Sequence, residues 1–264
     1  MKSVCFLIII LLSCSISGQD FAVKNLEESP RHMEWITLVH DDREVKCFQV
    51  YPEINTKAPG IIVIHENRGL TDWIRSTTDQ LAAHGLIAVA PDLLTGHGPN
   101  GGDTKNFANM DIAREAIYEL DQDQIISDLN AVFKSLKETP SCNGKIAIIG
   151  FCWGGSQVYQ YLMSNVEVVA GFVFYGTSPK SKKELDKIRT PVYGFYGEFD
   201  SRVTSTIWDT DKKMKELGKK YEPVIFEEGG HGFMRSGERP GANDGNIKAR
   251  TAAWRRLIPL LEEI

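Results

Sequence analysis

The residue with the clearest chemical potential is Cys152, which lies between glycines in the segment GFCWGG. An apolar run, KIAIIG, leads into this segment, and a helix-like stretch, SQVYQYLMSN, follows it. The pattern Gly-x-Cys-x-Gly between a strand and a helix is typical of a nucleophile elbow, here with cysteine in place of serine. The turn is so tight that the residues two before and two after the nucleophile must be small, and Gly150 and Gly154 meet this need. The N-terminal N–H groups of the following helix can stabilise a thiolate, and the Trp153 amide would donate to an oxyanion.

Three further side chains with catalytic potential follow apolar runs of the sequence. Glu66 comes after PGIIVIH, Asp200 after PVYGFYGEF and His231 after VIFEEGG. Because ligands of parallel sheets bind beyond the carboxyl ends of the strands, we expect these side chains and Cys152 to lie together. The order nucleophile, acid, histidine along the chain is the order that a nucleophile elbow requires. The sequence therefore predicts a Cys152–Asp200–His231 triad.

Each member of this triad also has a purely structural interpretation. Cys152 could be a buried, inert thiol, Asp200 could cap a helix that begins at Ser201, and His231 could be an ordinary loop residue. Glu198, two residues before Asp200, is a competing acid. The three residues together, at strand ends and in the required order, favour the catalytic interpretation.

Alternating apolar strands and amphipathic helices must position these residues. Such a pattern indicates a mostly parallel sheet with helices on both faces. An opening hairpin would supply the antiparallel edge of an eight-stranded sheet, and the loop TGHGPNGGDTKN would line the mouth of the pocket. We expect strands at residues 34–40, 44–52, 59–66, 86–93, 145–150, 168–176, 191–200 and 221–230, and helices at 71–85, at 111–138 in two pieces, at 156–165, from 201 onward and at 246–264.

The composition is that of an ordinary globular protein, with 42% hydrophobic and 25% charged residues in a chain of 264. Residues 30–264 are expected to form one domain with a sizeable core. The net charge of −5 argues against nucleic acid as a partner, because nucleic-acid binding needs a basic face. A small molecule is the expected ligand, and the sequence does not determine the oligomeric state.

Residues 1–18 have the pattern of an export signal. Lys2 supplies the positive start, Val4–Leu12 form a short apolar run, and small residues follow. The stretch LLSC resembles a lipobox, which would leave Cys14 lipidated, whereas cleavage after Ser17 or Gly18 would release the protein. Because the run is too short to span a membrane, a lipid anchor would be the membrane contact. The protein is expected to be exported, either periplasmic or secreted or lipid-anchored, and a buried N-terminal strand or helix is the alternative.

Three cysteines follow this segment, Cys47, Cys142 and Cys152, and three thiols cannot all pair with one another. A disulfide between Cys47 and Cys142 is compatible with export, but the expected strand order places the two residues several strands apart. His65 and Glu66 are not followed by a second histidine at zinc-binding spacing, and no Cys/His cluster has such spacing elsewhere. No metal site is expected.

With these residues assembled, the chain resembles the dienelactone hydrolases, which are cysteine members of the α/β-hydrolase fold. The resemblance rests on the segments IVIHENRGL, LIAVAPDLL, GKIAIIGFCWGG, YGEFD and GGHGFMR, and it extends over about residues 30–264. It implies Cys152 as the nucleophile, Asp200 as the acid and His231 as the base. It also implies that Glu66 contacts the thiol and helps to form the thiolate when an anionic substrate arrives.

The resemblance further implies contacts to the substrate. In the family, arginines bind a substrate carboxylate, and one of them lies four residues after the catalytic histidine, which matches Arg235. Arg114 is the nearest match to a second such arginine, although the spacing differs there. The backbone N–H of Asn67 is implied as the second oxyanion donor. A structural ion pair of Glu66 with Arg68 or Arg235 is the alternative to a catalytic role for that carboxylate.

These observations predict a hydrolase that cleaves an ester or lactone in the manner of a carboxymethylenebutenolidase, through a thioester on Cys152 and without a cofactor. A general carboxylesterase or acyl transferase with the same triad is an alternative that would differ only in the pocket. A peptidase is less favoured, because nothing in the sequence suggests a gating domain. A non-catalytic binding protein or thiol redox sensor on this scaffold would be expected to lack the histidine or the aspartate, and both are present.

Overall fold

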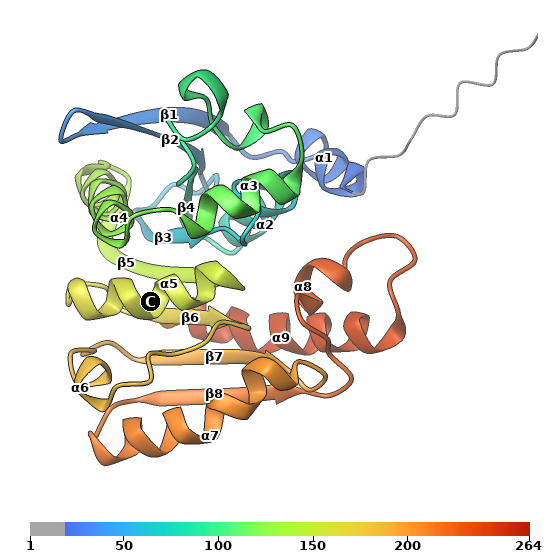
Figure 1. The fold of residues 1–264 in the computed structure, drawn as a ribbon. Coiled ribbons are helices and arrows are strands. Elements are labelled where there is room, and N and C mark those ends of the chain that lie inside the picture. Colours follow the sequence, from blue (N-terminus) through green and yellow to red (C-terminus); the bar gives the residue numbers. More distant parts are fainter. Residues whose placement is uncertain (1–18) are drawn as a thin grey trace, which may run out of the picture.

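The structure is a computed structural model that describes residues 19–264 (Figure 1). The export or lipoprotein signal expected at residues 1–18 lies outside the described residues. Within residues 19–264, no helix is both long enough and apolar enough to cross a membrane.

A single sheet of eight strands runs through the described part of the chain (Figure 1). Its strands are β1 (Met33–His40), β2 (Arg43–Val50), β3 (Ala58–Ile64), β4 (Ile87–Pro91), β5 (Cys142–Phe151), β6 (Gly171–Phe174), β7 (Val192–Gly197) and β8 (Tyr221–Phe226). They lie in the order β1-β2-β4-β3-β5-β6-β7-β8. The hairpin β1–β2 joins β4 in antiparallel fashion, and all the other pairings are parallel. The mostly parallel eight-stranded sheet predicted from the sequence is confirmed.

Helices connect these strands, and not all of them were anticipated. The helices α1 and α8 escaped the sequence analysis, whereas the segment at 111–138 forms two helices, as expected. The described helices are α1 (Asp20–Glu27), α2 (Asp72–Ala82), α3 (Met110–Tyr118), α4 (Gln122–Glu138), α5 (Trp153–Ser164), α6 (Lys182–Leu185), α7 (Ser201–Glu216), α8 (Phe233–Ser236) and α9 (Asp244–Glu262), with short 3-10 turns at Pro99–Gly101 and Thr104–Asn106.

The helices bury both faces of the sheet, which explains the continuous apolar runs of the central strands, such as Ile61–Ile64 on β3 and Ile146–Ile149 on β5. Ile61 and Ile62 are adjacent on β3, and their side chains point to opposite faces. Ile62 packs in the core beneath α4, α5 and α7, whereas Ile61 packs in the core beneath α2 and α9. Figure 1 shows α4, α5 and α7 in front of the sheet and α9 behind it. The carboxyl ends of the parallel strands are left open for a site.

The Gly-rich segment after β4 is held in place by a buried carboxylate. Asp92 is 3% exposed and accepts hydrogen bonds from the Thr104 backbone N–H at 2.9 Å and from the Thr104 hydroxyl at 2.7 Å. Lys46 donates to Asp103 at 2.9 Å from the neighbouring strand β2. These bonds fix the segment beside the loop that follows β3.

A second buried carboxylate attaches α4 to the opening hairpin. Asp128 is fully buried on α4 and accepts two hydrogen bonds from Arg43, at 2.9 Å from Nε and 3.1 Å from Nη2. His40 Nε2 lies 2.8 Å from the same carboxylate. Because a buried charge is costly without its partners, this cluster ties the helix to the sheet edge formed by β1 and β2.

Replacing Asp128 by Asn should therefore lower the free energy of unfolding by about 3 kcal/mol, since the Arg43 guanidinium is left partly buried without its counter-charge. Urea unfolding of the two proteins would measure the difference. Asp123→Asn is the matched control, because Asp123 is exposed on the same helix. The control should cost under about 1 kcal/mol. Equal losses in the two variants would contradict the stabilising role of the buried cluster.

Candidate active site

The thiol of Cys152 stands on a strained turn between β5 and α5. Its backbone has φ 55° and ψ −115°, a left-handed conformation that non-glycine residues seldom adopt. A Cβ atom on Gly150 would lie 2.2 Å from the carbonyl oxygen of Gly154, and one on Gly154 would lie 2.4 Å from the carbonyl oxygen of His65. The turn thus has the geometry of the nucleophile elbow that the glycine spacing predicts.

The structure brings the three residues of the predicted triad together at one edge of the sheet. His231 Nε2 lies 3.1 Å from the Cys152 sulfur, and His231 Nδ1 lies 2.5 Å from Asp200 Oδ2. Asp200 follows β7 and is 6% exposed. Asp200 occupies the N-cap position of α7, as the helix-cap interpretation supposed, but its carboxylate makes no capping hydrogen bond and contacts the histidine instead. The competing acid, Glu198, accepts from the Glu228 N–H and is not a partner of the histidine.

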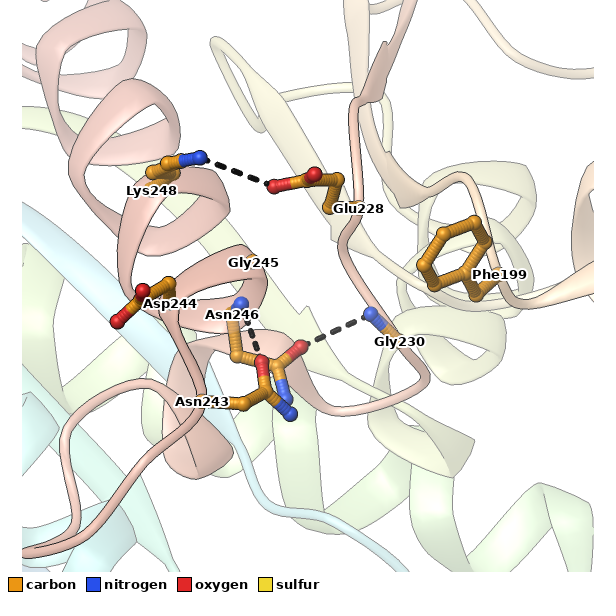
Figure 2. A pocket seen from close by; sticks show the side chains of 8 residues that line it. All are labelled: Phe199, Glu228, Gly230, Asn243, Asp244, Gly245, Asn246 and Lys248. Carbon is orange, nitrogen blue, oxygen red and sulfur yellow. Dashed lines mark hydrogen bonds and ion pairs between the residues drawn. The ribbon is translucent and has the colours of Figure 1, made fainter.

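The loop that carries His231 is held by the first turn of α9. Asn246 accepts a hydrogen bond from the Gly230 N–H at 2.9 Å, directly before the histidine, and Asn243 caps α9 by accepting from the Asn246 N–H at 2.8 Å (Figure 2). A pocket lies between this loop and the start of α9, and Lys248 pairs with Glu228 across it. The sequence analysis did not find these positioning residues, because their partners are remote in the chain.

The two neighbours of His231 change its acid–base properties. Burial lowers the pKa of the imidazole, but the hydrogen bonds and charges of Asp200 and Cys152 raise it more, and the net pKa is about 9. An imidazole with this pKa is protonated at neutral pH, where it can stabilise a neighbouring thiolate.

His65, at the end of β3, organises the opposite side of the site. Its ring is fully buried, and burial lowers its pKa, so the imidazole is neutral. The ring accepts from the Leu93 N–H at 3.3 Å through Nε2, and Nδ1 donates to the Glu66 carbonyl at 2.8 Å. It also stacks on Trp153, with 5.6 Å between ring centroids. His65 therefore fixes both segments from which oxyanion donors are expected, around Asn67 and Trp153.

Glu66 forms the ion pair that one interpretation of the sequence anticipated. Its side chain is 9% exposed, and Oε2 accepts from Arg235 Nε at 2.8 Å. The charge of Glu66 raises the pKa of the Arg235 guanidinium further above its ordinary value. The pair links the segment after β3 to α8, which follows His231 in the chain.

A cavity of about 460 Å³ opens at the thiol. Trp153 is the first residue of α5, so its N–H has no partner within the helix and is free to donate into this space. Buried Tyr175 lies across His231, with 5.2 Å between ring centroids, and its hydroxyl has no hydrogen-bond partner among the described residues. The cavity is lined by Asn67, Tyr118, Cys152, Trp153, Ser156, Tyr175, Thr177, Arg202 and His231.

The arginines differ from the expectation. Arg202, in the first turn of α7, lines the thiol cavity and was not identified from the sequence. Arg235 is engaged with Glu66 and lines a neighbouring cavity instead. Arg114 is exposed on α3 and lines neither of these two cavities. The positions of the arginines along the sequence could not show which of them lines the thiol cavity.

The other described cysteines are remote from this chemistry. Cys47 and Cys142 are buried and free, and they lie on β2 and β5, which β4 and β3 separate in the sheet. Burial raises the pKa of the Cys47 thiol far above its ordinary value, which makes it unreactive. Within residues 19–264, no group of three or more His, Cys, Asp or Glu side chains is arranged to hold a metal ion.

A mostly parallel eight-stranded sheet, covered on both faces and carrying a nucleophile elbow after a central strand, defines the α/β-hydrolase fold. Comparison with known families is more specific. The model of the dienelactone hydrolase family matches residues 45–264, and the chain belongs to this family. The family resemblance inferred from the sequence motifs is confirmed.

Individual relatives are distant but cover most of the chain. A "Putative carboxymethylenebutenolidase" of Methylorubrum extorquens is 28% identical over 236 residues, which are 84% of this chain and 78% of the relative. Among solved structures, a "Putative Dienelactone Hydrolase" from Klebsiella pneumoniae has a TM-score of 0.77 at 21% identity, covering 89% of this chain and 99% of that one. A dienelactone hydrolase-like promiscuous phosphotriesterase, P91, has a TM-score of 0.73 at 20% identity, covering 88% and 98%. The structural matches support the fold.

We expect His231 to titrate with a midpoint near pH 9 in NMR spectra of its imidazole protons. Because the folded-state pKa is raised above the ordinary 6.5, its pairing stabilises the fold fully below pH 6.5, and that contribution is lost as the pH rises through 9. The difference in unfolding free energy between the native protein and Asp200→Asn should shrink accordingly with rising pH. A midpoint below 6.5 would show that burial outweighs the two partners.

Proposed function

We propose that this protein hydrolyses an ester or lactone with Cys152 as the nucleophile, His231 as the base and Asp200 as the residue that orients the histidine. The observation that carries the proposal is the continuous chain of contacts from sulfur to imidazole to carboxylate, at 3.1 Å and 2.5 Å, on a nucleophile elbow. Membership of the dienelactone hydrolase family supports this type of chemistry.

In the proposed reaction, the thiol proton passes to His231 Nε2 before the attack, as the raised pKa of the imidazole favours, and the Cys152 thiolate then attacks the carbonyl carbon. The negative charge that develops on the carbonyl oxygen is stabilised by the backbone N–H groups of Trp153 and Asn67, both of which line the cavity. The tetrahedral intermediate collapses to a thioester, and the leaving alkoxide takes the proton from His231. Water then attacks the thioester, transfers a proton to His231 and releases the carboxylic acid and the thiol. No cofactor takes part.

The ion pair between Glu66 and Arg235 supports a preference for anionic substrates. In the family resemblance, a glutamate at this position assists thiolate formation and an arginine at this position binds a substrate carboxylate. The name carboxymethylenebutenolidase, given to the relatives, denotes an enzyme that acts on a lactone with a carboxyl group. Arg202 is the guanidinium in the thiol cavity itself, so we assign it the contact with a carboxylate close to the scissile bond. Arg114 is not part of the proposed site.

The alternatives make different demands on the site. A carboxylesterase or acyl transferase would use the same triad, and only the acceptor or the pocket would differ. A thiol redox protein needs a second cysteine near the reactive one, but Cys142 lies at the opposite end of β5 from Cys152, and Cys47 is buried on β2. The elbow and the orienting carboxylate favour acyl chemistry.

Cys152→Ala should abolish hydrolysis of a chromogenic ester, with a loss in kcat/KM of at least about 1,000-fold, because no other nucleophile is activated. Cys152→Ser should retain little activity, since a hydroxyl ionises far less readily than a thiol. In the native enzyme, rapid quenching and mass spectrometry should detect an acyl group on Cys152 that hydroxylamine removes. Cys142→Ala is the matched control and should keep full activity. Full activity in Cys152→Ala would disprove the nucleophile assignment.

We also propose that residues 1–18 direct export, by lipidation of Cys14 or by cleavage after Ser17 or Gly18. The charged start, the short apolar run and the LLSC stretch support this proposal. Radiolabelled palmitate should be incorporated in a bacterial host and lost in Cys14→Ser if the lipoprotein route operates. Unlabelled protein with a new N-terminus near Gln19 would indicate cleavage, and protein that keeps Met1 would contradict both routes.

A further inference from the structure

A second cavity, of about 600 Å³, lies next to Arg235, the partner of Glu66 in the ion pair of the site. Its walls come from segments that are far apart in the sequence: the loop into α2 at 68–72, the Gly-rich segment at 104–105, the start of α3 at 107–113 and the end of α8 at 235–239. The loop TGHGPNGGDTKN, expected at the mouth of the thiol pocket, thus contributes Thr104 and Lys105 to this neighbouring cavity rather than to the thiol cavity.

This cavity and the thiol cavity share their dividing wall. Asn67 lines the thiol cavity, and the next residue, Arg68, lines the second one. Helix α3 presents Ala113 to the second cavity and Tyr118 to the thiol cavity. Arg235 lines the second cavity while its Nε is bonded to Glu66. A ligand that enters both spaces would therefore pass along one loop and one helix.

The charge of the second cavity is strongly positive, although the whole chain carries −5. Four cations line it, and the single carboxylate, Asp72, is already paired with Arg75. One of the four, Arg235, is paired with Glu66. The side chains of the other three, Arg68, Lys105 and Arg239, form no ion pair or hydrogen bond to any residue in 19–264. Converging charges of one sign raise the local concentration of anions.

The same cavity has an apolar side. Leu70, Phe107, Met110 and Ala113 line it together with the cations. Such a mixture suits a ligand with a hydrocarbon portion that ends in an anionic group, because apolar contact and charge pairing are then satisfied together.

We propose that this second cavity binds an anionic group of the substrate, carried on an apolar spacer away from the bond that Cys152 attacks. Arg68, Lys105 and Arg239 would contact the anion, and Arg235 would stay with Glu66. The inference rests on the proposed hydrolytic function and narrows the substrate class to anionic esters or lactones with an extended apolar part. Carboxylate and phosphate share the chemistry that guanidinium groups recognise.

Three p-nitrophenyl esters of one chain length, ending in a carboxylate, a phosphate or a methyl group, would test this assignment. Their dissociation constants would be measured by calorimetry on Cys152→Ala, which removes the nucleophile, and their kcat/KM on the native enzyme. Introducing Arg68→Gln and Arg239→Gln together into the Cys152→Ala protein should raise the dissociation constants of the two anionic esters about 10-fold, because two exposed cations are lost. Binding of the methyl-terminated ester should not change, and the stronger-bound anion identifies the ligand.

Arg255→Gln is the matched control, since Arg255 is exposed on α9 and lines neither cavity. It should leave all three dissociation constants unchanged. Raising the salt concentration from about 0.05 M to about 0.5 M should reduce the preference for anionic esters, as screening predicts. Unchanged binding of both anionic esters in the double variant, or an equal loss for the methyl-terminated ester, would overturn the assignment. If the anionic esters bind as expected but the native enzyme hydrolyses none of the three, the hydrolytic function fails and the anion site stands.

Discussion

The close approach of α5 to the ends of β3 and β6 is the constraint on which the site depends. A Cβ atom on Gly154 would lie 2.5 Å from the Ile64 carbonyl oxygen, and one on Gly155 would lie 2.7 Å from the Phe174 carbonyl oxygen. Only glycine lets the helix start this close to two strands. The approach sets the Cys152 backbone in its left-handed conformation and places the thiol over the sheet edge. Every other group of the site reaches the thiol from neighbouring strand ends.

Electrostatic differences then separate two cysteines of similar intrinsic chemistry. Cys47 is buried in an apolar core, where burial raises its pKa and keeps the thiol protonated. Cys152 is half-buried, stands at a helix N-terminus and touches an imidazole whose pKa is about 9. The position in the fold, rather than the residue type, gives the two thiols different surroundings.

Asn67 and Arg68, next to the Glu66–Arg235 pair, border two spaces of different character. On one side lies the thiol cavity, with its hydroxyl groups, Trp153 and a single guanidinium from Arg202. On the other side lies a larger cavity with an apolar wall and with cations whose side chains have no partner within residues 19–264. The Glu66 carboxylate beside them is 9% exposed and is held by Arg235, so no buried charge is left unpaired there. The substrate class proposed above, an extended and anionic molecule, would occupy both spaces.

The sequence by itself determined the features that depend on local pattern. The apolar runs predict buried strands and the glycines around Cys152 predict the elbow, because both depend on residues close together in the chain. The order of Cys152, Asp200 and His231 could be matched to the fold because the order of such residues along the chain is characteristic of it. Only the tertiary structure decided between Asp200 and Glu198 as the partner of the histidine, and between Arg202 and Arg235 as the guanidinium at the thiol. Glu198 and Asp200 both lie in the turn beyond the end of β7, where the alternation of a strand no longer sets the side-chain directions. Arginines on separate helices approach one site only after the helices pack. Such choices depend on distances between remote segments, which no periodicity in the sequence contains.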